Sequence, residues 1–202
     1  MGIISSTAEL LRGKLNRADP EDRLADVIVE EANRLNGIVT DFLNFARPPT
    51  PNLTSCRVEE ILEKNLKFLA PEISSKGYKV YQRIGPNVPE VQADPGLLYQ
   101  AFLNVLINAM QAMPKGGEIV VKVSVQGNML QVVFVDDGPG ISEDMLGKIW
   151  DPFFTTKDKG SGLGLPIVKK IIEGLGGTVD LKNAEEKGAQ VTISFPIEGR
   201  KE

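Results

Sequence analysis

Two glycine-rich patches and two asparagines are the residues of this 202-residue chain whose types and spacing best suit chemistry. The patches, residues 136–140 (DDGPG) and 160–164 (GSGLG), enclose a segment with aromatic, Thr and Lys residues. Each patch alone is an ordinary turn signal, because Gly beside Asp or Pro is common in loops. Together with the asparagines they predict the walls of a nucleotide pocket.

Asn104 and Asn108 are four residues apart on a predicted helix and therefore lie on one face of it. A carboxamide oxygen is a hard ligand that can complete a Mg²⁺ shell beside phosphate oxygens and water. An Asn is neutral, so it adds no repulsion against a triphosphate. The alternative is that both amides face solvent.

Asp136 directly follows a predicted strand. Its carboxylate can accept a hydrogen bond from an exocyclic amine such as adenine N6, whereas guanine has a carbonyl there. Gly138 and Gly140 lack a Cβ, so a base could lie against their backbone. The alternative is a turn with solvated Asp side chains.

The second glycine patch, with Gly160, Gly162 and Gly164, leads into a predicted helix. Free backbone N–H groups at a helix start form a phosphate site, which the helix dipole reinforces. Neither the dinucleotide-binding fingerprint nor a Walker A motif is present. Lys157 and Lys159 precede the glycines and could neutralise phosphate charge, or they could be solvated loop residues.

These residues need a scaffold of helices and strands. Helical periodicity and alternating polarity predict three helices at residues 58–69, 95–113 and 165–175, a loop at 86–93, and five strands at 78–84, 118–125, 129–135, 178–181 and 189–195. Helices and antiparallel strands in mixed order indicate an α+β fold, a two-layer α/β sandwich. We expect a mixed, largely antiparallel sheet with helices on one face.

Further upstream, residues 3–16 and 20–45 are predicted helices, and the second has apolar residues in a three–four repeat. This repeat suits a helical hairpin or a bundle seam. Two helices alone bury little surface, so pairing of two copies into a dimeric four-helix bundle is favoured over packing onto the downstream domain. We expect domains at 1–48 and 56–202, joined by a Pro-rich linker at 49–55.

Composition narrows the function classes. A net charge of −4 argues against a nucleic-acid binder. The single cysteine excludes an internal disulfide and a cysteine-based zinc site. No apolar run approaches the ~18 residues of a membrane span, so we expect a soluble, cytoplasmic chain without membrane contact. The sequence contains no histidine, which excludes a mechanism that needs an imidazole within this chain.

Four segments resemble, in order and spacing, the motifs of sensor histidine kinases of two-component systems. Residues 94–112 resemble the N box, 136–140 the first glycine box, 150–157 (WDPFFTTK) the F box and 160–165 (GSGLGL) the second glycine box. The resemblance covers nearly all of residues 56–198. It implies the ATP-binding fold shared with gyrase and the heat-shock chaperone ATPases, behind a dimerisation hairpin.

The resemblance also implies ATP and Mg²⁺ as cofactors. Asn108 would hold the metal, Asn104 and Lys157 would be catalytic, and Asp136 would read adenine. A lid would span about residues 142–162. The implied nucleotide contacts, besides Asn108 and Asp136, are Gly138, Gly140, Ile141, Phe154, Thr156, Lys157, Gly160, Ser161, Gly162, Leu163, Gly164 and Leu165.

Asn104 stands where the ATPase relatives of this family carry a water-activating Glu. An amide is no general base, which disfavours hydrolysis and favours transfer of the γ-phosphate to a nearby nucleophile. The family nucleophile is a histidine on the first hairpin helix, which we expect just upstream of Met1. Gln111 stands where many members carry Lys, which gives Lys157 more weight as a phosphate contact.

The implied function is therefore that of a protein histidine kinase fragment, cut after its phospho-acceptor site and unable to phosphorylate itself on histidine. Its phosphate would pass to the aspartate of a response-regulator receiver domain. Two alternatives remain. A stand-alone serine kinase of the anti-sigma-factor type would have no reason to carry a coiled hairpin. A non-catalytic, nucleotide-switched scaffold would not need the intact pocket.

Overall fold

The structure is a computed structural model, and it describes residues 20–46, 50–157 and 160–197. The chain divides into two compact units, Met1–Arg47 and Pro48–Glu202. We describe each unit by itself.

In the first unit, α2 (Pro20–Ala46) is a helix of 27 residues, close to the predicted range. Apolar residues at helical spacing are exposed on it, namely Val27, Ile28, Leu35, Val39, Phe42 and Leu43. The predicted helix at residues 3–16 lies outside the described residues. No helix in the described ranges is both long enough and apolar enough to cross a membrane.

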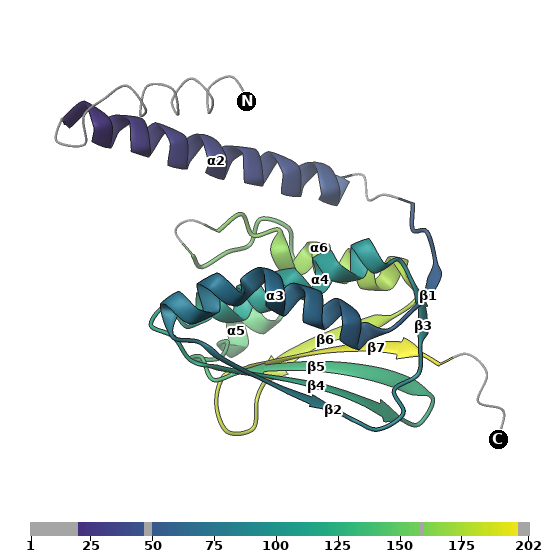
Figure 1. Cartoon of the computed structure of the whole chain (residues 1–202). Coiled ribbons are helices and arrows are strands. Elements are labelled where there is room, and N and C mark those ends of the chain that lie inside the picture. Colours follow the sequence, from purple (N-terminus) through teal and green to yellow (C-terminus); the bar gives the residue numbers. More distant parts are fainter. Residues whose placement is uncertain (1–19, 47–49, 158–159, 198–202) are drawn as a thin grey trace. The chain divides into compact units, whose positions relative to one another are not determined.

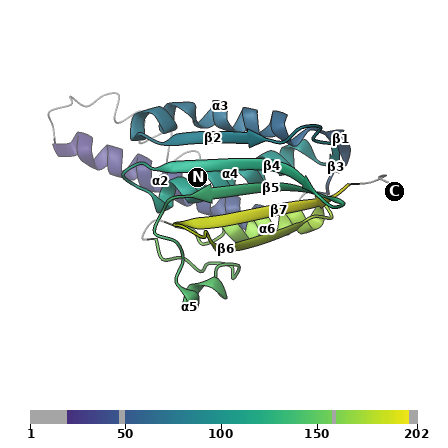
Figure 2. The same cartoon turned by 90° about the horizontal axis from the view of Figure 1, so that it is seen from below.

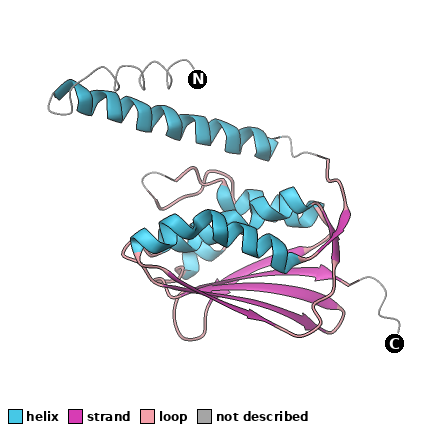
Figure 3. Ribbon diagram, in the orientation of Figure 1, coloured by secondary structure: helices cyan, strands magenta, loops and turns pink. Residues whose placement is uncertain are grey.

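The second unit has two layers, a sheet and a set of helices (Figures 1 and 3). The strand order is β2-β4-β5-β7-β6, and all neighbours are antiparallel except the parallel pair β2 and β4. The five strands are β2 (Lys79–Ile84), β4 (Glu118–Gln126), β5 (Met129–Asp136), β6 (Thr178–Asn183) and β7 (Ala189–Pro196).

Three helices, α3 (Val58–Lys76), α4 (Pro95–Ala112) and α6 (Gly164–Gly174), cover one face of this sheet (Figure 2). The core lies between the layers, where the Phe102 ring of α4 meets the Phe134 ring of β5 with centroids 5.5 Å apart. The predicted sandwich, with its largely antiparallel sheet and helices on one face, is confirmed.

The start of α4 follows from local chemistry. The Asp94 carboxylate accepts hydrogen bonds from the backbone of Gly96 (2.9 Å) and Leu97 (3.0 Å), and Pro95 occupies the first turn. An N-cap Asp followed by a proline in the first turn favours a helix start at this point. Asp94 also accepts from Asn52 N, and these backbone donors, Asn52 foremost, lower the pKa of its carboxyl. The cap thus fixes the helix that carries both asparagines.

Helix α3 is longer than the predicted 58–69, because it continues through Pro71 to Lys76. A proline inside a helix forfeits a hydrogen bond but does not always end it. The last turn is held by Gly77, which adopts φ 72° and donates its N–H to Ile73 O. An ion pair between Lys76 and Glu72 (2.6 Å) adds to it.

Three short elements were not predicted. The end of the predicted loop 86–93 forms β3 (Val91–Ala93), which pairs with β1 (Thr54–Cys56). Strands of three residues are too short to show alternation, so their pairing is invisible in the sequence. The four-residue helix α5 (Glu143–Leu146) projects beyond the β6 edge of the sheet (Figure 2).

Candidate functional site

Asp136 ends β5 and keeps one oxygen available. Its Oδ1 accepts hydrogen bonds from Gly138 N (2.9 Å) and from Ala189 N (3.2 Å), whereas Oδ2 has no donor among the described residues. Burial raises the pKa of this carboxyl, against the two backbone hydrogen bonds that lower it. An ionised carboxylate in such a place gains from an additional donor. Oδ2 is therefore suited to accept a ligand N–H.

Gly138 and Gly140 follow Asp136, and at both positions neighbouring atoms lie too close for a Cβ. A Cβ on the buried Gly138 would lie 2.8 Å from Asp136 Oδ1 and 3.3 Å from Met113 Cγ. Gly140 has φ 75°, and a Cβ there would lie 2.9 Å from Asn183 Oδ1. Gly138 therefore lies against the Asp136 carboxylate and Gly140 against the Asn183 side chain, and neither position has room for a Cβ without a shift of its neighbours.

A neighbouring contact was missed by sequence reasoning. Asn183, at the end of β6, accepts from Ile141 N (2.8 Å) and donates to Ile141 O (2.8 Å). Ile141, a predicted nucleotide contact, is thus tied to β6. Gly188, just before β7, lies so close that a Cβ on it would be 1.8 Å from Asp136 O. In the sequence both residues resemble ordinary hairpin-turn residues, so no signal marked them.

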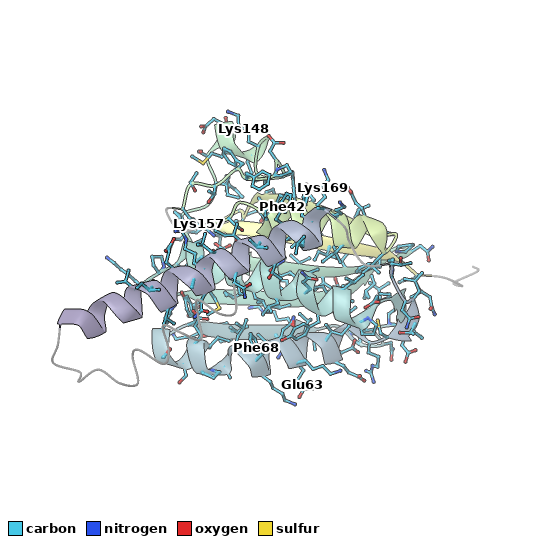
Figure 4. All side chains as sticks on the ribbon, turned by 90° about the horizontal axis from the view of Figure 1, so that it is seen from above. Phe42, Glu63, Phe68, Lys148, Lys157 and Lys169 are labelled. Carbon is cyan, nitrogen blue, oxygen red and sulfur yellow. The ribbon has the colours of Figure 1, made fainter. Side chains whose placement is uncertain are left out.

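The ammonium group of Lys157 contacts two side-chain amides of α4, those of Asn108 and Gln111. Lys157 Nζ donates to Asn108 Oδ1 (3.1 Å) and to Gln111 Oε1 (2.8 Å), and Figure 4 labels Lys157. Burial lowers the pKa of Lys157, whereas the charge of Asp136 raises it. Asn108 Oδ1 therefore already accepts from a cation. Asn104, one turn earlier, is half-buried.

The second glycine patch reaches the same asparagine. A Cβ on Gly164, the first residue of α6, would lie 3.3 Å from Asn108 Nδ2. The residue that caps α6, the buried Leu163, has a side chain that cannot accept a hydrogen bond. A helix start with uncapped N–H groups attracts anions. Asn108, Lys157 and the start of α6 thus converge.

Gly162 and Gly160, the other two glycines of the patch, lie close to residues 153–157. Gly162 adopts φ 67°, and a Cβ on it would lie 2.5 Å from the carbonyl carbon of Phe153. Phe153 has φ 68° and donates its N–H to Gly162 O (3.1 Å). Gly160 N donates to Lys157 O (3.1 Å), and a Cβ there would lie 2.6 Å from Thr155 Oγ1. The patch is therefore shaped by the segment that carries Lys157.

The remaining predicted residues belong to this segment and to the start of α6. Ser161 accepts at Oγ from Leu163 N (3.3 Å), Phe154 and Leu165 are half-buried, and Thr156 is exposed. Lys159 lies outside the described residues. An unpredicted contact lies at the start of the segment, where Lys169 Nζ of α6 is 5.7 Å from the Trp150 ring centroid. Figure 4 labels Lys169.

A comparison with known families identifies this arrangement. Residues 93–199, more than half of the chain, match the histidine kinase-, DNA gyrase B-, and HSP90-like ATPase family. The chain belongs to this ATPase family. The matched range contains α4 with its asparagines, Asp136 and both glycine patches.

Two proteins of similar sequence are named as kinases. The sensor histidine kinase ZraS of Escherichia coli strain K12 is 35% identical over 175 residues, which are 87% of this chain and 38% of ZraS. The chain thus spans well under half the length of that relative. Sporulation kinase E of Bacillus subtilis strain 168 is 31% identical over 173 residues, 85% of this chain and 23% of that kinase.

A solved structure of similar fold carries a nucleotide analogue. Full-length ShkA in complex with AMPPNP has a TM-score of 0.80 and 26% identity, over 96% of this chain and 42% of ShkA. The predicted resemblance is therefore confirmed, and the second unit is an ATP-binding catalytic domain of the histidine-kinase type. The two alternatives, a serine kinase of the anti-sigma-factor type and a non-catalytic scaffold, are not favoured.

Proposed function

We propose that this chain binds Mg²⁺–ATP in the second unit and donates the γ-phosphate to a histidine. Since the sequence has no histidine, the acceptor belongs to another segment or another polypeptide. The observation that carries the proposal is the convergence of the Asn108 amide, the Lys157 ammonium and the start of α6. A neutral ligand, a cation and free helix N–H groups are together what a triphosphate needs.

The adenine ring fits the other end of the site. Asp136 Oδ2 would accept from the N6 amine, and the backbone of Gly138 and Gly140 would lie against the ring. Asp136 and Lys157 are close enough that the charge of each shifts the pKa of the other. One nucleotide would then extend from β5 to the start of α6.

The donor set fits Mg²⁺ only together with a nucleotide. The described residues contain no group of three or more His, Cys, Asp or Glu side chains that could hold a metal. Asn108 Oδ1 would be the protein ligand, with phosphate oxygens and water completing the shell. The bound ion would neutralise phosphate charge. The Lys157 ammonium would leave Asn108 and turn to the phosphates.

Transfer is favoured over hydrolysis by the chemistry of Asn104. A carboxamide cannot take a proton from water, so this chain lacks a general base at that position. An incoming histidine brings its own nucleophile and needs only alignment and charge stabilisation, the two means by which phosphoryl transfer is catalysed.

The partners follow from the same class of reaction. We propose that residues 1–48 form a hairpin that pairs with a second copy, since Ile28, Leu35 and Val39 leave an apolar row exposed on α2. The structure of ThkA with its response regulator TrrA has a TM-score of 0.77 and 25% identity, over 99% of this chain and 58% of ThkA. By that likeness, the phosphate would pass on to a receiver domain.

The proposal is tested by supplying the acceptor separately. The chain is incubated with Mg²⁺ and radiolabelled ATP, with and without a separate hairpin from a related kinase that carries its histidine. We expect acid-labile label on the hairpin and none on this chain. Acid-labile label on this chain alone would refute the assignment, and acid-stable label on serine would favour the serine-kinase class.

Replacing Asn108 by Ala should remove the metal dependence of nucleotide binding. In the unaltered chain Mg²⁺ should strengthen ATP binding, because the amide oxygen completes the ion's shell. In the variant, titration calorimetry should give nearly the same ATP affinity with Mg²⁺ and with EDTA. Asn128→Ala, in the exposed β4–β5 turn, is the matched control. An undiminished Mg²⁺ effect in Asn108→Ala would exclude Asn108 as the ligand.

Replacing Lys157 by Met should weaken binding in proportion to the phosphates. Loss of a charged hydrogen bond to the terminal phosphates should lower ATP affinity by about tenfold. ADP should be affected less, and AMP hardly at all, because their charge lies farther from the ammonium. Lys148→Met, at an exposed position two residues after the end of α5, is the control. Equal losses for all three nucleotides would contradict a phosphate role.

A further inference from the structure

The connection between β6 and β7 lies directly beside the first glycine patch, although about forty residues separate them in sequence. It begins at Asn183, ends at Gly188, and is closed by a hydrogen bond from Ala184 N to Gly188 O (2.9 Å). Figure 3 shows it as the loop that extends from one end of the sheet. Nothing in the sequence connects it with a nucleotide.

Asn183 binds Ile141 in a way that only a carboxamide permits. Its Oδ1 accepts from Ile141 N and its Nδ2 donates to Ile141 O, both at 2.8 Å. The pair copies the two hydrogen bonds that facing residues exchange in an antiparallel ladder. A carboxylate could satisfy only the N–H, and an apolar side chain neither group. Position 183 is exposed, so packing does not dictate the residue.

The same connection holds the other end of the segment 136–141. Ala189 N donates to Asp136 Oδ1 (3.2 Å). Gly188 adopts φ 85°, and a Cβ on it would lie 1.8 Å from Asp136 O and 2.9 Å from Asp136 Oδ1. A Cβ on Gly140 would meet Gly188 O at 3.4 Å as well as Asn183. The connection therefore touches the segment at its start, near its end and at its last residue.

We propose that Asn183 is a positioning residue for the adenine end of the nucleotide site, an inference that rests on the proposed function. It contacts the backbone of Ile141 rather than the ligand. With Ala189 holding Asp136, it fixes both ends of the glycine segment. The direction of Asp136 Oδ2 and the backbone of Gly138 and Gly140 then become a rigid receptor for the base.

The test compares nucleotides that differ in the base with nucleotides that differ in the phosphates. Asn183→Asp and Asn183→Ala are measured by calorimetry against ATP, ADP and ITP, which has a carbonyl in place of the adenine amine. Each variant should lose about tenfold in affinity for ATP and equally for ADP, by loss of about 1.4 kcal/mol. The preference for ATP over ITP should fall. Lys182→Ala, the adjacent exposed residue, should change neither quantity.

Three results would contradict the positioning role of Asn183. Unchanged affinity in both Asn183 variants, with only a lowered Tm, would make the amide a structural tie. A loss confined to ATP would place its effect at the phosphates. A loss of ATP and ADP that leaves the ATP-to-ITP preference intact would also overturn the assignment to the base. If the unaltered chain bound no adenine nucleotide, the proposed function itself would fail, and the comparison separates that case.

Discussion

Replacing Asp136 by Asn should lower the affinity for ATP by about 100-fold. The variant loses a charged acceptor, and its amide N–H donors face the N–H donors of the adenine amine. Asp136 Oδ1 already accepts from Gly138 N and Ala189 N, so the amide oxygen of the variant would keep that place. The new NH₂ group would then point where the adenine amine should lie. The variant thus changes one oxygen to nitrogen and leaves the fold unchanged.

The opposite is expected for a base with a carbonyl at that position. ITP would accept from the new NH₂ group, so its affinity should change little or increase, and the ATP-to-ITP preference should collapse. Calorimetry with both nucleotides measures this ratio. Asp137→Asn is the matched control, because Asp137 Oδ1 accepts from Glu118 N (2.8 Å) on the neighbouring strand. If Asp136→Asn bound ATP as well as the unaltered chain, Asp136 would not read adenine.

Replacing Gly188 by Ala should lower the free energy of unfolding by about 3 kcal/mol, from left-handed backbone strain and overpacking combined. The added Cβ would lie 1.8 Å from Asp136 O and 2.6 Å from Asp136 C, and both are backbone atoms of β5. Relief requires the β6–β7 connection to move away from β5. The Ala189–Asp136 hydrogen bond would break, so nucleotide binding should be lost too.

Gly127→Ala separates the two contributions. Gly127 has a comparable φ of 59°, but nothing lies within 4 Å of its added Cβ. It should therefore show only the backbone strain, about 1 kcal/mol, and bind ATP normally. Urea unfolding followed by fluorescence reports on this unit, because the only tryptophan of the chain is Trp150. Equal destabilisation of the two variants would show that the contact at Gly188 is relaxed without strain.

The parts of this protein that could be predicted are those with local causes. The Asp94 cap with its proline, the apolar periodicity of α4 and the alternation in β4 and β5 each depend on residues a few positions apart. The same holds for the glycine patches, whose composition is itself the signal. Their order along the chain was enough to indicate the fold and the family.

What could not be predicted depends on contacts between distant segments. Asn183 and Ile141 are 42 residues apart, and Lys157 and Gln111 are 46 apart. Neither pair stands out, because Asn at a strand end and Gln on a helix are ordinary residues there. The pairing of β1 with β3 is hidden for the same reason. Only the folded chain places these side chains together.

The position of β7 in the sheet has a consequence for biosynthesis. It is the last of the described strands along the chain, yet it lies between β5 and β6, with Val191, Ile193 and Phe195 buried. A nascent chain that has not yet released β7 from the ribosome can pair β4 with β5, but β6 has no neighbour. Asp136 likewise lacks the Ala189 donor until then. The domain therefore becomes competent for ATP only after β7 has left the ribosome, and a chain shortened before β7 would lose two strands rather than one.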